Sequence, residues 1–304
     1  MLMRYPYLIL FFLFFPFIDV TDDLTLTLDE QTVATVNRRD FKDSFFGNLV
    51  LNNEKYLQLV ETIEEQVYQE PENASLIATK TLSPNRLGIS LLIGLLKSFF
   101  MTYFYDNRPA EIEVPRLTVY PKVDSEVLAD IRTQQIGRYV TYFNSFNKER
   151  SHNISLATEA INNHVVFPGE TFSFNKVVGK RTAERGYLSA PVIVKGELAE
   201  GIGGGICQVS STLFNAVDKA GLDIVQRYAH SRRVPYVPPG RDATVSWYGP
   251  DFVFKNKLNQ PILIRARTYG GQMVVLIYSS ESINNEPRTV PSAPNKLPEE
   301  INIE

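Results

Sequence analysis

Apolar and polar residues alternate along the chain over residues 24–36. Successive side chains of a strand point to opposite faces, so this alternation predicts two strands joined by a turn. The spacing then becomes helical, with apolar residues at intervals of four, three and four before Pro71. The residues that carry the two patterns are Leu24, Leu26, Leu28, Val33 and Val36 for the strands, and Tyr56, Val60, Ile63 and Val67 for the helix.

A second helix is expected over residues 87–103, where apolar residues form one wide stripe. Such a stripe belongs either to the core helix of a small α+β domain or to a surface that lies on a membrane or a partner. Lys97 and the other polar residues confine the stripe to one side, which favours the core helix. Alternating residues after it predict a strand over 112–119 that Pro115 interrupts. The stripe consists of Leu91, Leu92, Leu95, Leu96, Phe99, Phe100 and Tyr103.

Residues 136–280 show short strand patterns around two helical ones. Ser155 is expected to cap a helix that continues to Ile161, and a helix over 209–220 is expected to end at Gly221. A strand face is expected at Phe172 and Phe174. Together these elements predict an α+β fold, with further strands at 192–194, 243–247, 262–266 and 273–278.

The changes in pattern also suggest a domain organisation. We expect an N-terminal α+β domain over 21–115, a connection over 116–135 and a second domain over 136–280. Residues 281–304 carry four prolines and few core-forming residues, so we expect a disordered tail.

The first twenty residues have the features of an export signal. Arg4 precedes a run from Tyr7 to Ile18 that is apolar except for Pro16. The run is shorter than the ~20 residues that cross a bilayer as a helix, and no small-residue cleavage site precedes Asp19. A cleaved signal peptide and a retained membrane anchor both remain open, and either places the rest of the chain outside the cytoplasmic membrane, in the cell envelope.

Composition narrows the possible partners and cofactors. The chain has 31 basic and 34 acidic residues, so nothing indicates a nucleic acid as partner. One cysteine excludes an intrachain disulfide, and three histidines without a C-x-x-C pair give no basis for a metal site. We expect neither a metal nor a cofactor.

The single cysteine, Cys207, follows the glycine-rich stretch GIGGGI and opens the helical pattern. At the start of a helix, free backbone N–H groups and the helix dipole favour a thiolate, and the same groups can bind an oxyanion. Gly203, Gly204 and Gly205 lack side-chain bulk and would let a substrate carbonyl approach the sulfur. The alternative is an inert, buried cysteine beside a tightly packed turn.

A nucleophilic thiol needs a base, and His230 is the candidate. His152 and His164 flank a short helix and resemble solvated residues at its ends. His230 lies in RYAHSRRVPYVPPGRDATV, where an extended stretch, a turn and a second strand could bring Asp242 beside the imidazole. In the alternative interpretation Asp242 caps a turn and His230 is only hydrogen-bonded.

Several motifs in order resemble the VanW domain over about residues 136–268: FNSFNKERSHNISLATEAI, VVFPGETFSFNKVVGKRTAERGY, GIGGGICQVSSTLFNAV, RYAHSRRVPYVPPGRDATV and DFVFKN. The resemblance implies a compact VanW-type domain that acts on peptidoglycan as an L,D-transpeptidase, with Cys207 as nucleophile. Gln226 stands where an acidic residue often precedes the Arg-x-x-His-Ser run.

That activity implies further site residues. The backbone N–H groups of Cys207 and Gln208, with the Gln208 amide, would hold the oxyanion together with the three glycines, and Ser231 would contribute to substrate binding. Arg185, in the cluster Lys180, Arg181 and Arg185, could bind a stem-peptide carboxylate, as could Arg232 and Arg233, although solvated surface is the alternative for both clusters.

Two other functions fit the same residues. A cell-wall cysteine endopeptidase or amidase would use the same nucleophile with water as acceptor. A non-catalytic envelope-binding protein would use the glycine-rich turn as a groove. The resemblance implies peptidoglycan stem peptides as partners of the transpeptidase and of the endopeptidase or amidase. The sequence makes no prediction of oligomeric state or of a part in drug resistance.

Overall fold

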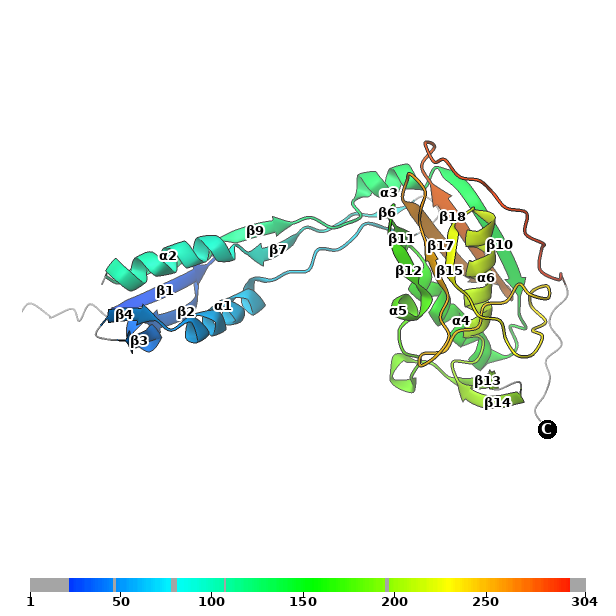
Figure 1. Ribbon diagram of the computed structural model, residues 1–304, viewed down its shortest axis with the longest axis horizontal. Helices are drawn as coiled ribbons and strands as arrows, with labels where there is room; N and C mark the ends of the chain where they lie inside the picture. The colour runs from blue at the N-terminus through cyan, green and yellow to red at the C-terminus, as the bar shows by residue number, and fades with distance from the viewer. Residues whose placement is uncertain (1–21, 46–47, 78–80, 107, 195–196, 296–304) are drawn as a thin grey trace, which may run out of the picture. The chain divides into compact units, whose positions relative to one another are not determined.

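The computed structural model describes residues 22–45, 48–77, 81–106, 108–194 and 197–295, which form two compact units. The first unit contains residues 22–72 and 86–121, and the second contains 73–85 and 122–295. Helices and small sheets are mixed in both, so the α+β class is confirmed (Figure 1). The expected export signal, residues 1–20, lies outside the described residues.

The first unit is built on a three-stranded sheet in the order β2-β1-β8. Strand β1 pairs antiparallel with β2 and parallel with β8, and Leu24 and Leu26 of β1 are fully buried against the helices. The elements are β1 (Asp23–Leu28), β2 (Gln31–Asn37), the 3-10 helix η1 (Arg38–Phe41), β3 (Lys42–Phe45), β4 (Asn48–Leu51), α1 (Asn53–Val67), β7 (Gly88–Leu91), α2 (Ile93–Asp106), β8 (Ala110–Glu113) and β9 (Arg116–Val119).

The helix expected over 87–103 begins later than its apolar stripe indicates. Residues 88–91 form β7, which pairs with β9, and α2 starts at Ile93. Leu96, Phe100 and Tyr103 are buried in the core, whereas Leu95 and Phe99, which share the predicted stripe, are each 39% exposed. The stripe is therefore wider than the surface that the small sheet and α1 can cover.

The second unit contains an antiparallel four-stranded sheet in the order β10-β18-β17-β11. One face carries α4 and α6 (Figure 1), whose apolar residues form one core with alternate residues of β17 and β18. The opposite face carries Leu263, which packs with Leu76, Leu128 and Ile131. These elements are β5 (Ser75–Leu76), β6 (Leu82–Ser83), α3 (Ser125–Ile131), β10 (Gln134–Tyr142), α4 (Lys148–Ile161), β11 (Val165–Val166), α6 (Ile206–Lys219), β17 (Ile262–Tyr269) and β18 (Gln272–Ser279).

A second sheet, in the order β12-β16-β15, and the hairpin β13-β14 complete this unit. Phe172 of β12 and Phe254 of β16 stack in its interior, with ring centroids 5.0 Å apart. The remaining elements are β12 (Thr171–Ser173), α5 (Phe174–Val178), the 3-10 helix η2 (Ala183–Arg185), β13 (Ser189–Val194), β14 (Glu197–Ile202), β15 (Asp223–Gln226) and β16 (Val253–Lys255).

Four local expectations differ from the structure. Phe174, expected on a strand face with Phe172, begins the short helix α5, because Ser173 caps this helix by accepting a hydrogen bond from the N–H of Lys176. Helix α4 begins at Lys148 and is capped by the side chain of Asn147, not by Ser155, because Asn147 accepts a hydrogen bond from the backbone N–H of Arg150. Residues 243–247 form no strand. Within the expected connection, 116–119 form β9 and 125–131 form α3.

The C-terminal segment also differs from the disordered tail that its prolines suggest. Val290 and Ala293 are buried in the main core of the second unit. Arg288 forms an ion pair with Asp218 of α6 at 2.9 Å and donates to the carbonyl of Leu222. These contacts hold residues 281–295 on the unit, and residues 296–304 lie outside the described part of the chain.

Candidate active site

Cys207 lies in the first turn of α6, as the helical pattern predicts. Gly205 is the N-cap residue with a φ of 104° and provides no side-chain cap. The backbone N–H of Cys207 meets no acceptor among the described residues. Its sulfur lies 3.7 Å from Thr244 Oγ1 and 3.6 Å from the carbonyl oxygen of Val245. Cys207 is only partly buried and lines a pocket.

His230 and Asp242 form a close pair beside this thiol. Imidazole Nδ1 lies 2.7 Å from Asp242 Oδ2, and the backbone N–H of His230 donates to the same oxygen at 2.6 Å. The side chains are only 5% and 10% exposed. Because Nδ1 is bound to the carboxylate, Nε2 is the ring nitrogen left for proton exchange with the thiol or a substrate.

The two titratable groups influence each other in opposite directions. Burial raises the pKa of the Cys207 thiol, but hydrogen bonding to His230 and its positive charge outweigh burial, so the net pKa lies below its usual value. Burial lowers the pKa of His230, but Asp242 and Cys207 outweigh burial and raise it to about 9. A thiolate and an imidazolium that stabilise each other are the protonation states that a nucleophile and a general acid require.

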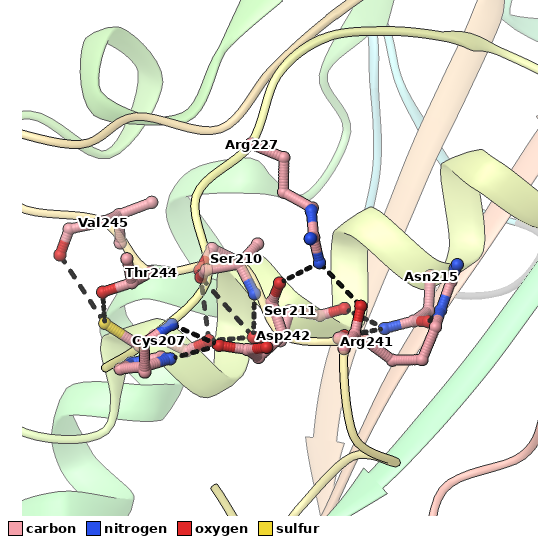
Figure 2. A network of polar contacts seen from close by, with 12 residues as sticks. Cys207, Ser210, Ser211, Asn215, Arg227, Arg241, Asp242, Thr244 and Val245 are labelled. Carbon is pink, nitrogen blue, oxygen red and sulfur yellow. Dashed lines mark hydrogen bonds and ion pairs between the residues drawn. The ribbon is translucent and has the colours of Figure 1, made fainter. Parts of the chain in front are cut away.

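A polar stripe on α6 fixes the segment that carries Asp242 (Figure 2). Ser211 Oγ donates to the carbonyl of Cys207 at 2.7 Å and accepts from the N–H of Ala243 at 2.8 Å. One turn further along α6, Asn215 donates to the carbonyl of Arg241, whose guanidinium in turn donates to Asn215 Oδ1. Since the stripe binds residues 241–243 directly, Asp242 reaches His230 without the strand pair expected from the sequence.

The three glycines have a structural role in the turn before α6. A Cβ on Gly204 would lie 2.6 Å from the carbonyl oxygens of Ala190 and Pro191, so this glycine allows β13 to approach. Gly203 and Gly205 have φ values of 88° and 104°, and a Cβ on Gly205 would meet Ile154 of α4. Packing and backbone conformation therefore require all three, and only Gly203 and Gly205 also line the pocket.

Gln208 cannot supply the oxyanion donors expected of it in this arrangement. Its backbone N–H donates a hydrogen bond to the carbonyl of Gly205, at 3.0 Å. Its amide Nε2 donates to Thr141 Oγ1 and to the carbonyl of Tyr142, while Oε1 accepts from Arg150. The side chain is completely buried and joins α6 to β10 and α4. The N–H of Cys207 is the remaining candidate donor.

The pocket that contains Cys207 has a volume of about 1390 Å³ and includes His230 and Ser231 in its lining. Arg185 does not line it, because its guanidinium donates to the carbonyl of Lys180 beside the pocket. Lys180 and Arg181 line the pocket instead.

Sequence spacing could not distinguish the three basic residues Lys180, Arg181 and Arg185, because no regular element determines which side chain turns inward. Thr244 and Val245 were not expected beside the sulfur, since their segment was predicted as a strand.

Within the described residues, no group of three histidine, cysteine, aspartate or glutamate side chains could hold a metal ion. No helix in that part of the chain is both long and apolar enough to cross a bilayer.

The second unit is thus an α+β fold in which a cysteine, a histidine and an aspartate come together at the start of a helix. Residues 149–278 match the family described as VanW like protein. The protein YoaR of Bacillus subtilis (strain 168) is 60% identical over 283 residues, which cover 93% of each chain. The chain therefore belongs to the VanW family, and the resemblance seen in its motifs is confirmed.

A second relative is the vancomycin B-type resistance protein VanW of Enterococcus faecalis (strain ATCC 700802 / V583). It is 32% identical over 106 residues, which cover 33% of this chain and 38% of that protein. No solved structure matches the chain at a significant level.

Proposed function

We propose that this protein is an acyltransferase of the L,D-transpeptidase type that forms 3-3 cross-links in peptidoglycan through a thioester on Cys207. The observation that carries the proposal is the coupling of the partly exposed thiol to an imidazole that Asp242 holds at 2.7 Å. Membership in the VanW family and the likeness to a protein named for vancomycin resistance favour a cell-wall substrate. The site would then work outside the cytoplasmic membrane, in a secreted or membrane-anchored protein.

In the first step the thiolate of Cys207 attacks the carbonyl at the L-centre of the diamino acid, the third residue of a stem tetrapeptide. The N–H of Cys207 stabilises the oxyanion, and such a donor contributes about 3 kcal/mol in other acyl transfers. The C–N bond to the terminal D-alanine then breaks, and the departing amine takes the Nε2 proton of His230. The products are a thioester and free D-alanine.

In the second step the side-chain amine of a neighbouring stem attacks the thioester. His230, now neutral, accepts the proton from this amine, the C–S bond breaks and the thiolate is regenerated beside the imidazolium. The new amide joins two diamino acids. Asp242 keeps the ring oriented and stabilises its positive charge throughout.

The test uses the full-length protein and a synthetic stem tetrapeptide, with an amine acceptor in excess. We expect release of D-alanine, a cross-linked dimer and an acyl adduct on Cys207 by intact-mass spectrometry. Cys207→Ala should give none of the three, and cross-linking that persists in this variant would overturn the proposal. Hydrolysis without any dimer would identify the site as an endopeptidase or amidase.

A further inference from the structure

The two terminal nitrogens of the Arg181 guanidinium are buried beside the candidate site, without a hydrogen-bond partner among the described residues. These atoms, Nη1 and Nη2, have almost no solvent exposure. Guanidinium groups stay protonated in proteins, and a buried charge without a partner is strongly destabilising. Such a cost indicates that the group serves a ligand, not the fold.

The nearby acid does not neutralise this charge by contact. Asp251 influences the pKa of Arg181, which burial lowers. Its carboxylate is already bonded, with Oδ2 accepting from Ser173 Oγ and Oδ1 from the backbone N–H groups of Asn175 and Phe252. The guanidinium carbon instead lies 5.7 Å from the ring centroid of Phe174. The ring supports the group from one side and leaves its N–H donors unused.

Arg181 also shares the pocket with the thiol and lies close enough to interact with its charge. The stem of Arg181 passes Gly203, where an added Cβ would lie 3.3 Å from Arg181 Cβ. The pocket lining has an excess of basic residues, Arg150, Lys180, Arg181, Arg232 and Arg233, over the acidic Glu149 and Glu200. An anion beside the thiol is therefore favoured at this end of the pocket.

We propose that Arg181 binds a carboxylate of the peptide substrate through its two unused N–H donor groups, in the planar arrangement that suits a carboxylate. This inference rests on the proposed acyl transfer and adds a substrate-binding residue to it. The carboxylate comes either from the terminal D-alanine, two bonds beyond the scissile amide nitrogen, or from the side chain of the diamino acid. Binding the first would discriminate against stems without a free C-terminus.

The experiment compares three synthetic tetrapeptides on the full-length protein: a free acid, its C-terminal amide, and a free acid with lysine as diamino acid. If Arg181 binds the terminal carboxylate, kcat/KM should fall about 10- to 100-fold for the amide, the loss expected for a charge-assisted hydrogen bond. If it binds the side-chain carboxylate, the lysine peptide should show that loss instead.

Arg181→Met keeps the apolar stem and removes the donors, so its kcat/KM should be low for the free acid and nearly equal for all three peptides. Arg181→Lys should restore part of the discrimination. Arg185→Gln is the matched control, since its guanidinium lies outside the pocket lining, and it should discriminate like the unchanged protein. Equal discrimination by Arg181→Met and the unchanged protein would overturn the inference and leave the proposed function intact.

A binding measurement separates the two proposals. Trp247 is the only tryptophan and lines the pocket, so its fluorescence reports peptide binding to the Cys207→Ala protein without turnover. A preference for one carboxylate that disappears in the Cys207→Ala, Arg181→Met protein supports the inference even if no peptide is turned over. Arg181→Met should also unfold in urea no earlier than the unchanged protein, and a marked loss of stability would instead assign Arg181 to the fold.

Discussion

At the scale of single residues, the site depends on two groups whose pKa values shift in opposite directions. The thiol of Cys207 titrates below its usual pKa, and His230 titrates near 9. Because the two groups are coupled, the protonation steps that an experiment resolves belong to the pair. The charged pair exists between those steps, so reactivity of the thiol should appear below the pH at which an ordinary cysteine reacts.

Alkylation by iodoacetamide tests this coupling directly. His230→Ala removes the two largest of the interactions that lower the pKa of Cys207, its hydrogen bond to His230 and the charge of the ring. The midpoint of the rate against pH should therefore move upward, toward that of an ordinary thiol. His152→Ala is the control, because His152 lies on α4 and contacts the carbonyl of Gly186. Identical midpoints for His230→Ala and the unchanged protein would show that the ring does not interact with the sulfur.

Asp242→Asn preserves the shape of the side chain and removes its charge. The pKa of His230 should then fall, because hydrogen bonding to the carboxylate is the main cause that raises it. We expect kcat/KM for cross-linking to drop about 10²- to 10⁴-fold, the range for loss of general acid–base catalysis. The decline of the rate at high pH, which marks loss of the imidazolium proton, should begin at a lower pH.

Glu200→Gln provides the comparison for Asp242→Asn. Glu200 lines the same pocket but accepts a hydrogen bond from Ser189 Oγ, whereas Asp242 binds the imidazole. It should change kcat/KM only a few-fold. Similar losses in the two variants would mean that general negative charge, and not orientation of His230, is what matters.

At the scale of elements, helix α6 is both a core helix and a support for the site. Its apolar side packs on β10 and β18, and its polar stripe binds the segment of Asp242. Ser211→Ala would leave the buried N–H of Ala243 and the carbonyl of Cys207 with fewer partners. We expect a loss of about 1–3 kcal/mol in the free energy of unfolding, measured in urea by Trp247 fluorescence.

Ser231→Ala is the matched serine variant, because Ser231 is exposed in the pocket lining. Its free energy of unfolding should change by no more than about 0.5 kcal/mol. If Ser211→Ala is as stable as Ser231→Ala, the polar stripe does not hold the segment. A drop in thiol reactivity that accompanies the stability loss would link the two roles of α6.

The elements also show what the sequence could predict. Helical spacing located α6 and Cys207 in its first turn, because period and glycine caps are local signals. The alternation at 243–247 indicated an extended segment, but no neighbouring strand pairs with it, and its partners are side chains of α6 and the carbonyl of Tyr228. Contacts with residues far away in the chain determine such pairing. The sequence therefore predicts the contact between Asp242 and His230 correctly, but through a strand pair that does not form.

At the scale of the whole molecule, two separate segments of the chain, residues 73–85 and 122–295, build the second unit. Leu76 of β5 is 5% exposed and packs with Leu128, Ile131 and Leu263. Residues 73–85 were expected within the N-terminal domain, since no local signal shows that they pack on β17. Leu76→Ala should therefore lower the free energy of unfolding of the second unit by about 2–5 kcal/mol.

Trp247 lies in the second unit and reports its unfolding in urea. Val225→Ala is the control, because Val225 lies on β15 of the same unit and is 57% exposed. Its effect should stay near 0.5 kcal/mol. An unfolding curve for Leu76→Ala that coincides with that of Val225→Ala would mean that residues 73–85 contribute nothing to the second unit.

The contact between Leu76 and Arg265 has a consequence for the order of folding. Arg265 Nη1 donates to the carbonyl of Leu76 across a sequence separation of 189 residues. Ribosomes release chains from the N-terminus, so β5 emerges long before the strand that it needs. Pairings this distant are slow to form because a long loop must close first. The nascent chain therefore exposes β5 without its packing and hydrogen-bond partners on β17 until synthesis is nearly finished. A chaperone that binds this segment during synthesis should raise the yield of native protein.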